Sequence, residues 1–157
     1  MQLTTFSDYA LRVLVYLGLQ HDRLTTIAEI AAAYKISENH LMKVVHHLAQ
    51  HGYVETTRGK GGGLRLAHPP GEIVVGRVIR TTEGETSLLD CLDSVEIVCC
   101  IQPSCRLMGI LNEASAAMFA VFDKYTLADL LQSRVSLERL FQEQKSDATE
   151  SSPAGSH

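Results

Sequence analysis

The sequence has no tryptophan and only four prolines, and it has no long apolar stretch. A helix that spans a membrane needs about 20 consecutive apolar residues, so no membrane association is expected. The N-terminal residues MQLTTFSDYA do not combine a basic segment with an apolar one, which is the pattern of a secretory signal. We therefore expect a cytoplasmic protein.

Cysteine is missing from most of the chain, because all four cysteines lie within residues 91–107, CLDSVEIVCCIQPSCRL. In the cytoplasm, clustered cysteines are more often metal-binding or redox-active than disulfide-bonded. The spacing lacks the C-x2-C pairs and nearby histidines of structural zinc sites, and iron–sulfur clusters are held mostly by cysteine. The residues alone suggest an iron–sulfur site, and they leave zinc, a metal-free thiol switch and a disulfide open.

The formal net charge of −4 hides an asymmetry between the two halves of the chain. Residues 1–68 carry 7 Lys and Arg against 5 Asp and Glu, whereas residues 69–157 carry 7 against 13. Six of the 7 histidines also lie in residues 1–68. A relatively basic N-terminal half on an acidic remainder favours a nucleic-acid-binding face there.

Apolar periodicity predicts three helices in this half. Apolar residues at helical spacing indicate an amphipathic helix over 5–20. Thr26 and Glu29 have the spacing of a capping box before a second short helix. After a brief turn at 33–36, Ser37 can cap a third helix that ends at Gly52. Its apolar stripe consists of Leu41, Val44, Val45 and Leu48.

Residues 53–67 predict a hairpin with a glycine-rich tip, and helix, helix, turn, helix, hairpin is the order of a winged helix-turn-helix domain. In that arrangement the third helix enters the DNA major groove and the hairpin is the wing. The predicted DNA-binding residues are Asn39, His40, Lys43, His46, Arg58, Lys60, Gly61 and Gly62. Glycines allow close approach to DNA, and the two wing cations suit phosphates or a narrow minor groove. The alternative is a merely solvated helix face and an ordinary turn.

The C-terminal half is predicted to be helical on either side of the cysteine loop. A short helix is expected over 72–84, a long helix over 106–124, and two further helical segments from Thr126 and over 136–144. The long helix carries a heptad-like seam of Leu107, Leu111, Ala114, Met118, Val121 and Tyr125. Such a seam favours a homodimer, with packing on its own domain as the alternative. Residues 145–157 are polar and are predicted to be a disordered tail.

Nothing in the sequence indicates an enzyme: there is no nucleophile–base pairing, no metal-hydrolase motif and no nucleotide fingerprint. A second possibility is a metal-binding or redox protein that uses a winged-helix fold as a protein-interaction module. The predicted fold class is mainly α with a small β-hairpin wing: a winged helix-turn-helix domain plus a long C-terminal dimerisation helix.

Four segments carry a resemblance to a known family: MQLTTFSDYALR, RGKGGGLRL, the C-x5-CRL element from Cys99 to Cys105, and KYTLADL at 124–130. With them, the chain resembles the iron–sulfur winged-helix repressors, and in particular their nitric-oxide-sensing members, over nearly its whole length. The resemblance implies a homodimeric repressor that binds a palindromic operator while it carries one iron–sulfur cluster per subunit, 4Fe–4S favoured over 2Fe–2S. Nitric oxide would attack the cluster and release the DNA, so that nitric-oxide detoxification genes are expressed.

The same resemblance implies the cluster ligands Cys91, Cys99 and Cys105, with Asp8 as an oxygen ligand that reaches the cluster of the other subunit. Two departures concern this set: the gap after Cys91 is longer than usual in the family, and Cys100 is extra. Met108 lies where the biogenesis-regulating members have a histidine, which disfavours a regulator of iron–sulfur biogenesis. A regulator of iron–sulfur biogenesis or of general redox state with the same fold is the alternative function.

The resulting domain prediction has five parts. They are a winged helix-turn-helix domain at 1–70, a connecting helix at 71–90, a cluster-binding loop at 91–105, the dimerisation and C-terminal helices at 106–144, and the tail at 145–157.

Overall fold

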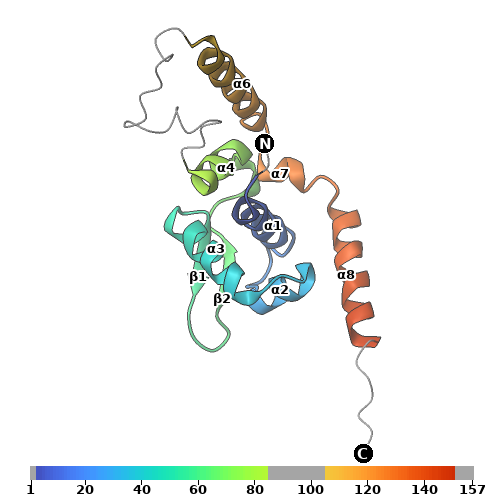
Figure 1. The fold of residues 1–157 in the computed structure, drawn as a ribbon. Helices are drawn as coiled ribbons and strands as arrows, with labels where there is room; N and C mark the ends of the chain where they lie inside the picture. The colour runs from blue at the N-terminus through green and yellow to red at the C-terminus, as the bar shows by residue number, and fades with distance from the viewer. Residues whose placement is uncertain (1–2, 85–104, 151–157) are drawn as a thin grey trace, which may run out of the picture.

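The computed structural model describes residues 3–84 and 105–150, with side chains described up to residue 142. Its elements are α1 Thr5–Leu19, α2 Ile27–Tyr34, α3 Glu38–Gln50, β1 Val54–Thr57, β2 Gly63–Leu66, the 3-10 helix η1 Pro70–Glu72, α4 Val75–Glu83, α6 Arg106–Phe122, α7 Leu127–Leu130 and α8 Arg134–Glu150. The protein is mainly helical with one antiparallel hairpin, which confirms the predicted fold class. The helix α6 projects from the body that α1 to α4 and the hairpin form (Figure 1). By contrast, α8 packs against this body, because the Phe141 ring lies 5.4 Å from the Tyr16 ring by centroids. Within the described ranges, no helix is long and apolar enough to cross a membrane.

The core forms around α1, which packs against α3, α4 and β2. The predicted apolar stripe of α3 is confirmed, since its four residues are all buried. Leu14 of α1 and Leu41 and Leu48 of α3 have no exposed surface. Each such leucine contributes about 1.5–3 kcal/mol on burial, so the stripe holds α3 in a defined rotation about its axis. That rotation leaves the polar side of α3 facing solvent.

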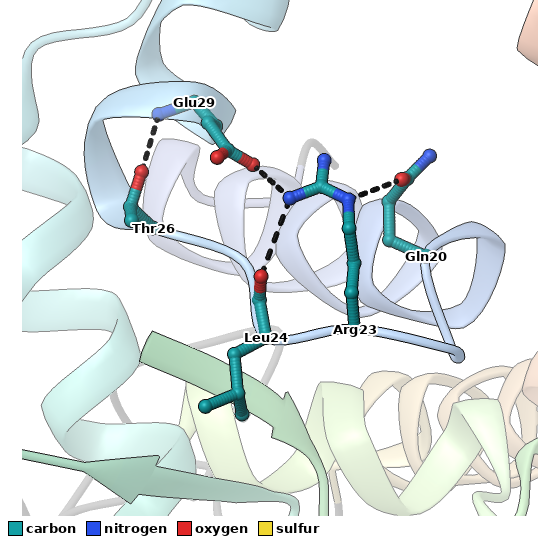
Figure 2. Close-up of polar contacts among 5 residues, drawn as sticks. All are labelled: Gln20, Arg23, Leu24, Thr26 and Glu29. Carbon is teal, nitrogen blue, oxygen red and sulfur yellow. Dashed lines mark hydrogen bonds and ion pairs between the residues drawn. The ribbon is translucent and has the colours of Figure 1, made fainter. Parts of the chain in front are cut away.

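A polar network around Arg23 holds the turn between α1 and α2 (Figure 2). The Arg23 guanidinium donates to the Gln20 side chain at 3.1 Å, to the Leu24 carbonyl at 3.2 Å and to the Glu29 carboxylate at 2.8 Å. Thr26 is the N-cap of α2, and its hydroxyl accepts from the Glu29 N–H at 3.2 Å. The predicted capping box is therefore half formed, because the Glu29 carboxylate binds Arg23 (Figure 2).

The hairpin is anchored to the body at its base. Val54 pairs with Leu66 and Thr57 with Gly63, so five residues remain for the tip. The outer edge of β2 is also paired, because Leu64 exchanges two backbone hydrogen bonds with Thr25, at 2.7 and 3.0 Å. At the tip, Gly59 and Gly61 have φ values of 99° and 82°, a region that side chains disfavour. The tip glycines are thus required by the turn itself.

The C-terminal helices begin and end differently from the prediction. Ile73 and Val74 are extended because their backbone pairs with residues 125–127: the Leu127 N–H donates to the Ile73 carbonyl at 2.8 Å. This tertiary pairing delays the start of α4 to Val75. The last helix also extends beyond the predicted 136–144, because α8 spans Arg134–Glu150. Residues 145–150 contain Lys, Ala and Glu, which favour helix, and Pro153 comes only later.

A bidentate ion pair joins α4 to the end of α6. The two terminal nitrogens of the Arg80 guanidinium each lie 2.7 Å from an oxygen of the Asp123 carboxylate, and the guanidinium carbon lies 4.4 Å from the centre of the Phe119 ring. The hydrogen bond from Arg80 holds the pKa of Asp123 below its ordinary value. Gly76 faces Asp123 so closely that a Cβ would collide with its carboxylate. This contact sets where α6 leaves the domain.

Candidate DNA interface and cluster ligands

The outward face of α3 carries the polar residues that were predicted to meet DNA. Asn39, His40, Lys43 and His46 are all exposed. Ser37 is the N-cap residue, but its carbonyl rather than its side chain makes the local hydrogen bonds, from the N–H groups of residues 40 and 41. The face is open because the buried stripe lies on the other side of the same helix, and α3 packs directly against β1 (Figure 1).

The hairpin tip adds two cations beside this helix. Arg58 and Lys60 are exposed, and within the described part of the chain neither forms an ion pair. By contrast, Arg65 on β2 lies 2.7 Å from the Glu55 carboxylate on β1. Gly61 is exposed at the tip, and Gly62 is partly covered because its N–H donates to the Gly59 carbonyl at 2.9 Å. Two unpaired cations on an exposed turn are free to bind phosphate.

Asp8 lies in the first turn of α1 and is paired with a residue that the sequence analysis missed. Its carboxylate is 2.9 Å from the Arg12 Nε, and the two side chains are 46% and 44% exposed. The Arg12 guanidinium also lies 5.5 Å from the centre of the Tyr34 ring, and burial raises the pKa of Tyr34 to about 12. The spacing of four residues on a helix is the signal that could have revealed this pair.

Of the predicted cysteine ligands, the structure describes only Cys105. It is the N-cap residue of α6 and carries a half-buried free thiol. Cys91 and Cys99, like Cys100, lie outside the described residues, so the predicted ligand set stays a prediction. Within the described ranges, no three His, Cys, Asp or Glu side chains converge on a possible metal position. A thiolate and a carboxylate are donors that suit iron, so Cys105 and Asp8 fit a cluster chemically.

A helix-turn-helix with an anchored wing, an exposed polar helix face and a long projecting helix define a winged-helix regulator. The family model for Rrf2, described as "Iron-dependent Transcriptional regulator", matches residues 3–133, and the chain belongs to this family. A relative in Geobacillus kaustophilus, named HTH-type transcriptional regulator NsrR, is 50% identical over 92% of this chain and 99% of its own. A relative of the same name in Bacillus subtilis is 47% identical over 89% of this chain and 97% of its own. These relatives are named as regulators and not as enzymes.

Solved structures show the same fold. CymR of B. subtilis, described as its global cysteine regulator, is 28% identical with a TM-score of 0.63, and the match covers 83% of this chain and 95% of that one. The T. potens IscR structure is 24% identical with a TM-score of 0.64 and covers 99% of this chain and 94% of that one. The second likeness concerns the fold alone.

Proposed function

We propose that this protein is a cytoplasmic, homodimeric transcriptional repressor that binds operator DNA while it carries an iron–sulfur cluster, and that nitric oxide is its signal. The observation that carries the DNA-binding part is the open polar face of α3 beside a wing with two unpaired cations. The iron-dependent family and the relatives named NsrR support the choice of cofactor and signal. We propose one cluster per subunit, 4Fe–4S in preference to 2Fe–2S.

The residues of α3 are suited to direct reading of bases. Asn39 can accept and donate toward an adenine edge, and Lys43 can donate to a guanine. Both are exposed, and His40 and His46 flank them on the same helix. The wing cations would meet the backbone or a narrow minor groove beside the site of α3. Base contacts then select the operator, while the wing contributes affinity.

The dimer is proposed to form through α6. None of its residues is buried in the single chain, and Leu107, Ile110 and Val121 are 53%, 60% and 49% exposed. A helix of 17 residues is about 25 Å long, and apolar side chains at this spacing are covered most simply by the same face of a second copy. A two-fold axis along α6 would present two α3 helices to a palindromic operator.

The cluster is proposed to be held by Cys91, Cys99 and Cys105, with Asp8 as oxygen ligand from the other subunit. When bound, the cluster supplies iron that reacts with nitric oxide. We propose that the Asp8 carboxylate exchanges its ion pair with Arg12 for the cluster iron. Among the residues described, Arg12 would then keep its contact with the Tyr34 ring. In this way α1, which packs against α3 and α4, has different side-chain contacts in the loaded and the unloaded protein.

The test uses protein purified without oxygen. Visible absorbance and Mössbauer spectra identify the cluster, and selection from random duplexes identifies the operator. We expect tight operator binding by the loaded form, and loss of binding when nitric oxide is added. Operator binding that ignores both the cluster and nitric oxide would contradict the proposal, and zinc in place of iron would favour a different metal-binding regulator.

A matched pair of variants tests the ligand set. Cys99→Ala should lose both the cluster absorbance and operator binding, whereas Cys100→Ala should keep both, because the C-x5-CRL element assigns the ligand role to Cys99. Loss of the cluster in Cys100→Ala alone would reverse this assignment. Asp8→Ala should assemble a cluster with an altered spectrum.

A further inference from the structure

The last turn of α4 is tied to the beginning of α1. The Glu83 carboxylate accepts from the Thr4 N–H at 2.7 Å and from the Thr4 hydroxyl at 3.0 Å. One residue earlier, the Thr82 hydroxyl lies 2.7 Å from the Ser7 hydroxyl. Thr4 is the N-cap of α1, so a carboxylate sits at the positive end of that helix, where it is stabilising. The two helix ends are therefore held together by three hydrogen bonds.

The same turn is also tied to α3. The His47 Nε2 lies 3.0 Å from the Thr81 carbonyl oxygen. A carbonyl can only accept, so Nε2 carries the proton and donates. The Thr81 hydroxyl, which donates to the Arg77 carbonyl at 2.8 Å, lies 3.3 Å from the Tyr53 hydroxyl just after α3. The last four carbonyls of a helix lack partners within the helix, and His47 supplies one for α4.

The His47 ring is fixed on its other sides. The Phe6 ring of α1 meets it edge to face, with centroids 5.2 Å apart. The His51 ring lies 4.2 Å from it by centroids, and the His51 Nδ1 is 2.9 Å from the His47 carbonyl. The half-buried His47 side chain thus lies where α1, α3 and α4 meet. A shift of the last turn of α4 cannot leave it in place.

His47 also lies next to the residues of α3 proposed to meet DNA, since His46 directly precedes it and Lys43 lies one turn earlier. In the sequence, the last turn of α4 is followed by the segment that contains Cys91. We propose that His47 is a positioning residue through which the last turn of α4 sets the orientation of α3 on DNA. This inference rests on the proposed function, and it adds the residue that links the cysteine segment to the reading helix.

The experiment compares His47→Leu, which removes the donor, with His47→Gln, whose amide can still donate to the Thr81 carbonyl. For each, the affinity for the selected operator is measured with and without the cluster. One hydrogen bond corresponds to about two- to tenfold in affinity. We expect the ratio of operator affinity with the cluster to affinity without it to fall by about that factor in His47→Leu. In His47→Gln this ratio should return toward the wild-type value. The cluster spectrum should stay unchanged in both variants. Equal weakening of both forms, or a His47→Gln variant as impaired as His47→Leu, would overturn the proposal.

Amide hydrogen exchange in the unloaded protein tests the link without DNA or cluster. His47→Leu should speed exchange at residues 82–84, at the end of α4, and in α3, and His47→Gln should restore the slower exchange. Unchanged exchange in His47→Leu would show that the link does not hold the two helices. A different outcome is that the wild-type protein binds the operator equally well with and without the cluster, while hydrogen exchange still responds to His47→Leu as expected. The link between α4 and α3 then stands, but the proposed cluster dependence fails. The proposal that His47 orients α3 in response to the cluster is overturned by that result.

Discussion

Neutralising the wing cations should reduce the salt dependence of DNA binding by a predictable amount. Lys60 is exposed and forms no ion pair within the described residues. It lies at the hairpin tip between Gly59 and Gly61, both of which have positive φ values. Each phosphate contact contributes about 0.9 to the slope of log affinity against log salt. A homodimer has two wings, so Lys60→Gln should lower the slope by about 1.8. The same reduction in slope applies to Arg58→Gln, and the slope of the double variant should fall by about twice that amount.

The slope converts into a directly measurable difference. Between 50 and 200 mM salt, wild-type affinity should fall about tenfold more than that of Lys60→Gln. Fluorescence anisotropy with the selected operator at four or more salt concentrations measures both slopes. The matched control is Lys124→Gln, which removes the same charge at an exposed position next to the end of α6, far from the hairpin in the fold (Figure 1). Equal slopes for Lys60→Gln and the Lys124 control would refute the assignment of the wing.

Three further changes test stability and assembly. Leu127→Ala should lower the free energy of unfolding by about 2–5 kcal/mol in urea titrations, because Leu127 is 1% exposed. The control Leu130→Ala changes a residue that is 39% exposed, and it should lower the free energy of unfolding by about 0.5 kcal/mol or less. Partial burial raises the pKa of Glu83, but hydrogen bonds from residues 4 and 7 outweigh it and lower the pKa below the ordinary 4.5. The resulting stabilisation is present above about pH 4.5 and is lost as pH falls through the lowered pKa, so unfolding of Glu83→Gln should depend less on pH below that value, and an unchanged pH profile would contradict this. Leu107→Lys with Val121→Lys should convert the dimer into folded monomers in light scattering, because both side chains are exposed in the single chain, and a dimer of unchanged mass would exclude α6 as the interface.

Local sequence patterns were sufficient for the DNA-binding half. The stripe from Leu41 to Leu48 determined which side of α3 is buried, and so which side is open, because helical geometry relates positions three and four residues apart without reference to the rest of the fold. The hairpin followed from two β-prone runs around glycines, two of which do have positive φ. The prediction that α3 and the wing bind DNA remains a prediction for the salt experiment.

The contacts that join distant segments could not be read from local patterns. The pairing of Ile73 with Leu127 shortened a predicted helix, because it offers the backbone hydrogen bonds that the helix would otherwise make. The Arg80–Asp123 ion pair and the Glu83–Thr4 contact join residues 43 and 79 positions apart. Neither residue type nor spacing indicates such partners, since surface charges occur throughout the chain.

The sequence by itself determined the class of protein and predicted the residue types of its sites, because periodicity, turn chemistry and clustered cysteines are local properties of the chain. Only the tertiary structure decided that the last turn of α4 meets α1 and α3 at His47, and that α6 projects with Leu107, Ile110 and Val121 exposed. These depend on how helices pack, and packing is a property of the whole core: each buried contact is set by the shapes of several elements at once.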